Sequence, residues 1–286
     1  MAQRPPNCRV NYQAMRRLGV VFAGLGHMGA GSNTLFDASG YGNHGTLTNM
    51  AIPATATSGW LYDSRLARNA FRTDGSNDRI SLPIGSGTDI GGDYSGAYWA
   101  RIDVLPSSQA HLFSCYDGTS YWYMSRVSYP TANYLRFETS SGTTVWDNAA
   151  WRDYNWHHFA YTKSGAVMRI YFDGSVVSSI TNAETAAKII NQNLTIGLAK
   201  FPSNQYIYAI AATFSDVLLR IGSAFCQAEV SALADPSNVM LKIGSDSLLL
   251  DPRRRLFRAF PSGGGAPAAF KPYWIPQRNR MIGATL

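Results

Sequence analysis

The chain has 286 residues, of which 45% are hydrophobic and 15% are charged. This composition excludes a disordered chain and is typical of a globular protein with a large core. Glutamate is scarce and aromatic residues reach 13%, which favours strands over long amphipathic helices. No apolar run approaches the length that spans a bilayer, so we expect no membrane association.

The net charge of +7 is concentrated at the two ends of the chain. Residues 1–36 carry four arginines and no acid, and residues 251–286 carry seven basic residues against one acid. Residues 37–250 carry 14 basic and 17 acidic residues. Basic ends on a slightly acidic body predict arms that dock on an acidic partner. Solvated tails without a function are the alternative.

The three cysteines, Cys8, Cys115 and Cys226, are isolated and odd in number. Their spacing supports neither a zinc site nor a disulfide framework. The apolar stretch Leu18–Leu25 is too short and too broken for a signal peptide. We therefore expect a soluble protein made in a cytoplasm.

In chain order, residues 1–17 are expected to form an irregular basic arm, followed by a strand at Leu18–Ala23. The next residues, G-L-G-H-M-G from Gly24 to Gly29, match a dinucleotide-binding fingerprint. That mechanism needs a helix directly afterwards, but Ala30–Asn33 and the glycines that follow are poor helix formers. We interpret the match as coincidental.

A turn-forming segment follows, D-A-S-G-Y-G-N-H-G-T-L-T-N, from Asp37 to Asn49. Asp37 and Asn43 supply oxygen atoms that could bind calcium, so calcium remains open although no cofactor is expected. The alternative is that Asp37 hydrogen-bonds the backbone around Ser39 and Gly40. We favour this alternative, since two side-chain ligands fall short of the six or more that calcium takes.

Strands separated by turn residues then recur at regular intervals, which indicates a β-sandwich. The string W-H-H-F-A-Y-T-K-S-G-A-V-M-R-I-Y-F-D-G, Trp156–Gly174, predicts a hairpin ending in an Asp-Gly turn. One short helix is predicted at Gln227–Ala234, with a capping box between Cys226 and Glu229. The two strands of the hairpin are predicted at Trp156–Thr162 and Val167–Phe172. The other predicted strands are Ala70–Thr73, Arg79–Leu82, Ser95–Val104, His111–Cys115, Tyr121–Val127, Tyr134–Glu138, Leu194–Leu198 and Ile207–Phe214.

Four strings in this order resemble the LamG-like branch of the concanavalin A-like jelly rolls. They are the turn from Asp37, the segment F-R-T-D-G-S-N-D-R-I-S-L-P from Phe71, the Trp156–Gly174 hairpin, and the strand and helix from Ser215 to Pro236. The resemblance implies an all-β fold, an antiparallel β-sandwich jelly roll over residues 18–250. Basic arms at 1–17 and 251–286 would flank it.

The end of the chain, K-P-Y-W-I-P-Q-R-N-R-M-I-G-A-T-L, is similar to Trp/Arg endings of tailed-bacteriophage virion proteins. This resemblance implies a non-enzymatic structural or decoration protein of a virion, made in the host cytoplasm and homo-oligomeric on the particle. Its arms would bind capsid or other virion proteins through Arg–carboxylate pairs. The candidate partner-binding residues are Arg253, Arg254, Arg255, Arg258, Lys271, Trp274, Arg278 and Arg280.

Three alternative functions remain. A lectin-like adhesin would bind glycans on exposed aromatics, with Trp122 beside Tyr121 and Tyr123, or with Trp146 beside Asp147 and Asn148. A polysaccharide hydrolase is disfavoured, because no paired-carboxylate pattern occurs and His157 and His158 suit a structural hairpin better. Nucleic acid is disfavoured because the body of the chain is acidic. We therefore expect no enzymatic activity.

Overall fold

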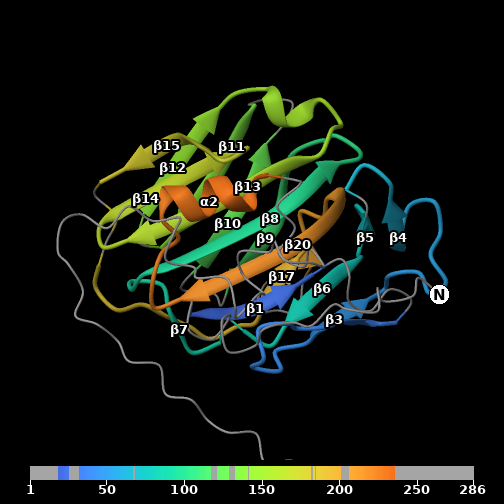
Figure 1. The fold of residues 1–286 in the computed structure, drawn as a ribbon, viewed down its shortest axis with the longest axis horizontal. Coiled ribbons are helices and arrows are strands. Elements are labelled where there is room, and N and C mark those ends of the chain that lie inside the picture. Colours follow the sequence, from blue (N-terminus) through green and yellow to red (C-terminus); the bar gives the residue numbers. More distant parts are fainter. Residues whose placement is uncertain are drawn as a thin grey trace, which may run out of the picture. The chain divides into compact units, whose positions relative to one another are not determined.

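Figure 1 shows the chain in a computed structural model, built mainly from strands. The structure describes residues 19–25, 32–66, 68–84, 86–116, 121–128, 133–140, 142–181, 183, 185–200 and 206–235. Two large antiparallel sheets pack face to face, as the sequence predicts for a jelly-roll sandwich.

The first sheet has the order β15-β14-β13-β8-β20-β5-β4, and β1 also pairs with β20. Its strands are β1 Val20–Gly24, β4 Gly59–Asp63, β5 Arg68–Asp74, β8 Tyr94–Ile102, β13 His157–Ser164, β14 Val167–Phe172, β15 Ser175–Ile180 and β20 Ala211–Ile221.

The second sheet has the order β12-β11-β10-β9-β17-β6-β3-β2. Its strands are β2 Thr34–Leu35, β3 Gly45–Thr48, β6 Arg79–Leu82, β9 Gln109–Tyr116, β10 Tyr121–Ser128, β11 Tyr134–Thr139, β12 Gly142–Asp147 and β17 Leu194–Ile196. The smaller elements are β7 Thr88–Asp89 with β16 Ile189–Ile190, β18 Ala199–Lys200 with β19 Tyr206–Ile207, the 3₁₀ turn η1 Ala150–Arg152 and the helix α2 Gln227–Leu233.

The core between the sheets is dominated by aromatic side chains. The ring of Tyr98 on β8 stacks with Phe113 across the sandwich and with Phe159 on β13, at centroid distances of 6.0 and 5.6 Å. Trp122 is also fully buried. Such pairs add to the free energy gained by burying apolar area, so the high aromatic content is used mainly in the core.

The predicted hairpin is confirmed. Strands β13 and β14 pair in register from Phe159↔Phe172 to Ser164↔Val167. Asp173 and Gly174 then both take positive φ, at 48° and 82°, as the two central residues of a tight hairpin turn require. This turn leads directly into β15.

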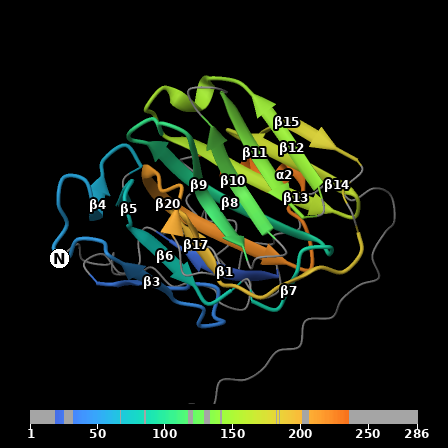
Figure 2. The same ribbon diagram turned by 180° about the vertical axis from the view of Figure 1, so that it is seen from behind.

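Helix α2 covers part of the outer face of the first sheet, and it lies on the near side in Figure 1 and behind the strands in Figure 2. Its Val230 joins a second buried cluster with Ala97, Ala160 and Leu218. The predicted capping box is present, since the Glu229 carboxylate accepts a 2.8 Å hydrogen bond from the Cys226 N–H.

Some boundaries differ from the sequence-based prediction. The single strand predicted at Ile207–Phe214 is wrong, because Tyr208 has φ of 57° and separates β19 from β20. The Asp74-Gly75 turn lies between β5 and β6, which belong to different sheets, so it carries the chain across the sandwich. The sequence pattern predicts no separate strand at β3, β4, β12 or β15.

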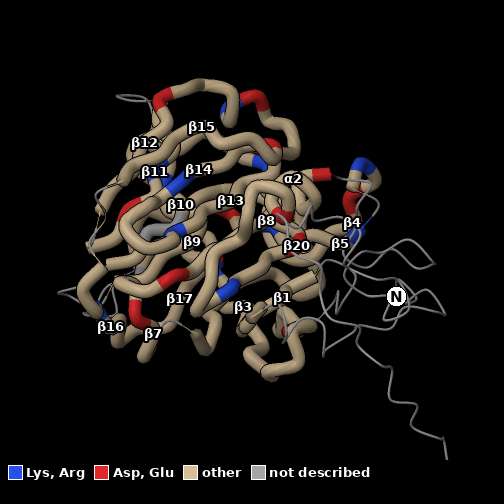
Figure 3. Tube along the Cα trace, turned by 60° about the vertical axis from the view of Figure 1, so that its left-hand side comes forward, with Lys and Arg blue, Asp and Glu red and all other residues tan. Residues whose placement is uncertain are grey.

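Charged positions are interspersed over the described body and are not gathered on one face (Figure 3). Within the described residues, no helix is long and apolar enough to cross a membrane. The predicted arms are a different case. Residues 1–17 and all eight candidate partner-binding residues, from Arg253 to Arg280, lie outside the described residues.

Candidate functional site

The turn at Asp37 is held by its own carboxylate. Asp37 Oδ1 accepts hydrogen bonds from the N–H groups of Ala23 and Ser39, at 3.0 and 2.8 Å. Its Oδ2 accepts from the Ser39 hydroxyl at 2.7 Å and from the Asn43 N–H at 2.9 Å. The Asn43 amide donates to the Val21 carbonyl at 2.7 Å. This is the side-chain-to-backbone arrangement weighed above as the alternative to calcium.

The two adjacent histidines of the hairpin face different surroundings. His157 Nδ1 lies 2.8 Å from Asp173 Oδ2, and its Nε2 lies 2.8 Å from Asp153 Oδ1. Burial opposes protonation, but these carboxylates outweigh it and raise the pKa of His157. Because both ring nitrogens are occupied, this imidazole joins the Asp153 loop to the β14–β15 turn.

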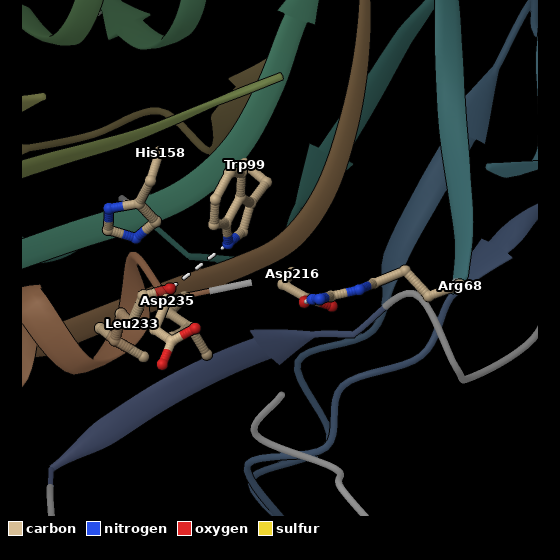
Figure 4. A pocket seen from close by; sticks show the side chains of 7 residues that line it. Arg68, Trp99, His158, Asp216, Leu233 and Asp235 are labelled. Atoms are coloured by element: carbon tan, nitrogen blue, oxygen red, sulfur yellow. Dashed lines mark hydrogen bonds and ion pairs between the residues drawn. The ribbon is translucent and has the colours of Figure 1, made fainter. Parts of the chain in front are cut away.

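His158 points to the outer face of the first sheet, where it lines a small pocket shown in Figure 4. The pocket is lined by Arg68, Trp99, His158, Asp216, Leu218, Leu233 and Asp235. Its volume of about 10 Å³ corresponds to about one water molecule, far below the size of a substrate site.

The groups around this pocket are paired mainly with one another. Arg68 and Asp216 form a buried ion pair, and the Trp99 indole N–H donates to the Leu233 carbonyl at 3.3 Å. His158 Nδ1 is buried without a hydrogen-bond partner, and burial lowers the pKa of His158 to about 3. A neutral imidazole in a pocket of this size indicates packing of α2 against the sheet.

The aromatic residues that could bind glycans differ in how far they are buried. Trp122 is fully buried and edge-on to Tyr94, at a centroid distance of 4.8 Å, so it cannot present a surface. Trp146 packs against the core, and its ring centroid lies 4.8 Å from that of Phe172. Tyr121 points away from the core and is half-buried.

The carboxylates of two of the three glutamates are used in ion pairs. Glu229 binds both terminal nitrogens of Arg220, at 2.8 and 3.0 Å. Glu138 is shared by two arginines, described below, and Glu184 lies outside the described residues. Among the described residues, no group of three or more His, Cys, Asp or Glu side chains could hold a metal ion.

A charged cluster that sequence reasoning missed lies on the outer face of the second sheet. We call it the basic patch, and it comprises Tyr121, Arg126, Tyr134, Arg136, Glu138 and Lys188. Alternation places it there, since Trp122, Val127, Leu135 and Phe137 point into the core. The available signal was the alternating run Y-L-R-F-E, which indicates which residues share a face but not which strand lies beside them.

In the basic patch, a single carboxylate oxygen faces two guanidinium groups. Glu138 Oε2 lies 3.3 Å from Arg126 Nη2 and 3.3 Å from Arg136 Nη1. The Arg136 guanidinium also lies over the Tyr134 ring, 4.7 Å from its centroid. All three charged side chains are at least three-quarters buried, so their charges are weakly screened.

Solved structures similar to this chain share its fold. Domain 4 of AbnA, an extracellular arabinanase of Geobacillus stearothermophilus in complex with arabinotriose, aligns with a TM-score of 0.54 and 18% identity, over 76% of this chain and 98% of that one. The receptor-binding domain of botulinum neurotoxin D aligns with a TM-score of 0.57 and 12% identity, over 77% of this chain and 53% of that one. A mutant of Trypanosoma rangeli sialidase aligns with a TM-score of 0.57 and 15% identity, over 80% of this chain and 34% of that one.

At these identities the similarities establish the fold alone. The chain spans about half of the toxin domain and about a third of the sialidase, so their activities do not transfer to it. No curated protein matches the sequence. The family profile described as the concanavalin A-like lectin/glucanases superfamily, Laminin_G_3, matches residues 74–217, which form half of the chain and include most strands of both sheets. The chain therefore belongs to the concanavalin A-like lectin/glucanase superfamily, as a LamG-like β-sandwich.

Proposed function

We propose that this chain is a non-enzymatic structural protein of a virus particle, of the kind found in tailed bacteriophages. It is made in the host cytoplasm and joins the particle in several copies. The sandwich forms part of the surface, and the basic ends bind acidic surfaces of capsid or other virion proteins. Repeated copies turn modest individual contacts into firm attachment.

The observation that carries this proposal is the separation of charge between body and ends. Both sheets and α2 lie within residues 19–235, whereas residues 251–286 alone carry a net charge of +6. We assign the most basic segment to a partner, because the described strands and α2 already form the two packed sheets. Arginine suits this task, because its planar fork pairs with carboxylates bidentately.

The non-enzymatic part of the proposal is supported by how the ionisable groups are used. His157 engages both ring nitrogens, His158 borders a pocket of about one water molecule, and Glu138 and Glu229 are bound to arginines. A glycosidase needs two carboxylates facing a substrate cleft. The carboxylates of Glu138 and Glu229 serve ion pairs instead, and that of Asp37 holds a turn.

Mass spectrometry of purified particles tests the proposal directly, and the chain is expected as a stoichiometric component. A deletion of residues 251–286 should leave the circular dichroism of the sandwich unchanged and abolish incorporation. The matched control is Arg169→Gln on β14, which removes one half-buried charge from the body and should leave incorporation intact. Normal incorporation of the deleted protein would refute the anchoring role.

A second candidate function is carbohydrate binding by a lectin-like adhesin. The basic patch favours it, because hydrogen-bond donors and half-buried tyrosines share one sheet face there. Aromatic rings with a few placed polar groups are the usual composition of small-ligand sites. The similar arabinanase domain was solved with arabinotriose. Retention on immobilised glycans, lost when the patch is altered, would support this candidate.

A further inference from the structure

The first turn of α2 is tied to the first sheet by an ion pair. The Glu229 carboxylate lies 2.8 Å from the Arg220 guanidinium of β20. That guanidinium also lies over the Phe225 ring, 4.4 Å from its centroid. The Phe225 N–H donates to the Ser95 hydroxyl of β8 at 3.1 Å. The start of the helix is therefore fixed by a charged contact.

The last turn of α2 is held differently, over the pocket shown in Figure 4. Leu233 lines this pocket together with Trp99 and His158, and its carbonyl accepts the Trp99 indole N–H at 3.3 Å. The Trp99 ring is edge-on to the His158 imidazole, at a centroid distance of 5.6 Å. The Ser231 hydroxyl donates to the Gly174 carbonyl at 3.1 Å. These contacts are neutral hydrogen bonds and packing.

The surroundings of the His158 imidazole disfavour a positive charge. The residue is 2% exposed, and its Nδ1 has no hydrogen-bond partner among the described residues. The pocket admits about one water molecule, which is too little to hydrate an imidazolium. The nearby Asp173 carboxylate is engaged, since Oδ1 accepts the His158 N–H and Oδ2 meets the His157 ring. Burial therefore outweighs Asp173 and lowers the pKa of His158 to about 3.

The other charged groups on the elements around His158 are paired or screened. They are Arg68 on β5, Arg101 on β8, Asp216 on β20, Glu229 on α2 and Asp235 after α2. Arg68 and Asp216 pair with each other. Arg101 and Glu229 belong to ion pairs with other residues. Asp235 is exposed, so water screens its carboxylate. A proton on His158 would therefore weaken the packing of α2 above it.

We propose that His158 makes the docking of α2 sensitive to acid. When the imidazole takes up a proton, the last turn of α2 leaves the sheet and the ring becomes hydrated, while the first turn stays bound to β20. Residues 236–286, which include the segment of charge +6, follow this helix in the sequence. Acid therefore releases the end of α2 to which that segment is joined. This inference goes beyond the proposed function, since it holds for any partner of the basic segment.

Linkage between protonation and docking gives the size and sign of the effect. The pKa of His158 is about 3 in the docked state and returns to about 6.5 once the ring is hydrated. Docking is thus strongest above pH 6.5 and weakens as the pH falls, by about 25-fold in its equilibrium constant between pH 7 and pH 5. An ordinary aspartate keeps its charge over this range. His157 acts in the opposite direction, because its pKa is raised.

Hydrogen exchange of backbone amides reports this docking. The helix has seven residues, too few to be stable in water, so its hydrogen bonds break once it leaves the sheet. The Ala234 N–H, which donates to the Val230 carbonyl at 3.0 Å, is the probe. After correction for the intrinsic exchange rate, its protection in the full chain should fall about 25-fold from pH 7 to pH 5.

Two non-titrating variants and a matched control identify the group responsible. In His158→Gln the fall in protection should shrink to less than about twofold. His158→Met should give the same result if glutamine impairs folding. His111→Gln is the control, because His111 is equally buried but lies on β9 of the other sheet, and it should keep the full fall. Circular dichroism at pH 7 checks that each variant folds.

Each contrary outcome overturns the proposal. Protection of Ala234 that stays constant from pH 7 to pH 5 in the unaltered protein would show that acid does not release α2. An unchanged fall in both His158 variants would show that another group is responsible. If the fall also disappears in His111→Gln, exchange follows unfolding of the whole sandwich, and local release of α2 is wrong.

Discussion

The ammonium of Lys163 donates a 2.6 Å hydrogen bond to the carbonyl oxygen of Gly91, on the loop that leads into β8. It also donates to the carbonyls of Gly92 and Gly165, at 3.2 and 3.1 Å. The Lys163 side chain is fully buried, and Asp93 closes the same junction by accepting from the Gly165 N–H at 2.7 Å. One internal cation thus joins the β8 loop to the β13–β14 turn.

Replacing Lys163 by methionine should destabilise the sandwich. Methionine keeps the length and apolar stem of lysine but removes all three donors, so three carbonyls lose a charged partner. We expect the free energy of unfolding to fall by about 2–4 kcal/mol. Urea denaturation followed by tryptophan fluorescence measures the change. Arg169→Gln, which alters a half-buried β14 arginine, should cost less than about 0.5 kcal/mol. An equally small loss for Lys163→Met would contradict the stabilising role of the three hydrogen bonds that Lys163 donates.

Two histidines that are buried within the described part of the chain should make the protein acid-sensitive. Burial lowers the pKa of both His111 and His158 to about 3, against 6.5 in an unfolded chain. Between these values the unfolded state binds more protons than the folded state. Stability is therefore complete above pH 6.5 and falls as the pH drops toward 3, by about 1.4 kcal/mol per pH unit for each histidine.

His157 should act in the opposite direction. Its pKa is raised, because Asp173 and Asp153 outweigh the effect of burial. Its contribution is therefore complete below pH 6.5 and is lost as the pH rises through its folded pKa. Unfolding free energies measured from pH 4 to 8 check both signs. His158→Gln should flatten the acidic limb, and His157→Gln should flatten the neutral limb. Unchanged slopes in these variants would contradict the assignment.

How much of this fold the sequence predicts depends on where the constraint lies. The β6 and β14 strands have the predicted bounds, because alternation and flanking turns fix both ends locally. Strand β15 could not be found in this way, because it lies at a sheet edge and none of its residues is buried, so burial imposes no pattern on its sequence. Tyr208 follows β19 with positive φ. Tyrosine rarely adopts this conformation, so its presence in the sequence does not predict a break between strands.

Candidate sites follow the same division. The Asp37 turn was predictable, because its hydrogen bonds join residues 37–43 to one another and to a single strand, β1. The basic patch was not, because its like-charged pair exists only once β10 and β11 are in register, and a bulge between Tyr123 and Arg126 shifts that register. Sequence spacing alone cannot place a bulge, so Arg126 could not be assigned to the face of Arg136.

The Arg68–Asp216 pair should behave as a buried ion pair whose partners depend on each other. Asp216 is nearly buried and has φ of 49° at the bulge in β20. Arg68→Met would leave its carboxylate without this partner, and we expect a loss of about 3–5 kcal/mol. Asp216→Asn keeps a residue that tolerates this backbone conformation.

A double-mutant cycle measures the coupling in this pair. The Arg68→Met/Asp216→Asn double variant should be more stable than the sum of the single losses predicts, by at least about 1 kcal/mol. Additive losses would show that the two side chains act separately. Thermal and urea unfolding should give the same sign.

The Asp37 turn should not depend on calcium. Four donors already occupy the Asp37 carboxylate, so the turn holds its shape without an ion, and adding EDTA should not lower the unfolding midpoint. Asp37→Asn replaces one acceptor oxygen by a donor that meets other donors, and should cost about 2–3 kcal/mol with or without calcium. A ligand that binds only the folded state raises its stability by mass action. A midpoint that rises with calcium in the unaltered protein but not in Asp37→Asn would therefore identify a metal site, because a turn held only by hydrogen bonds gives no such linkage.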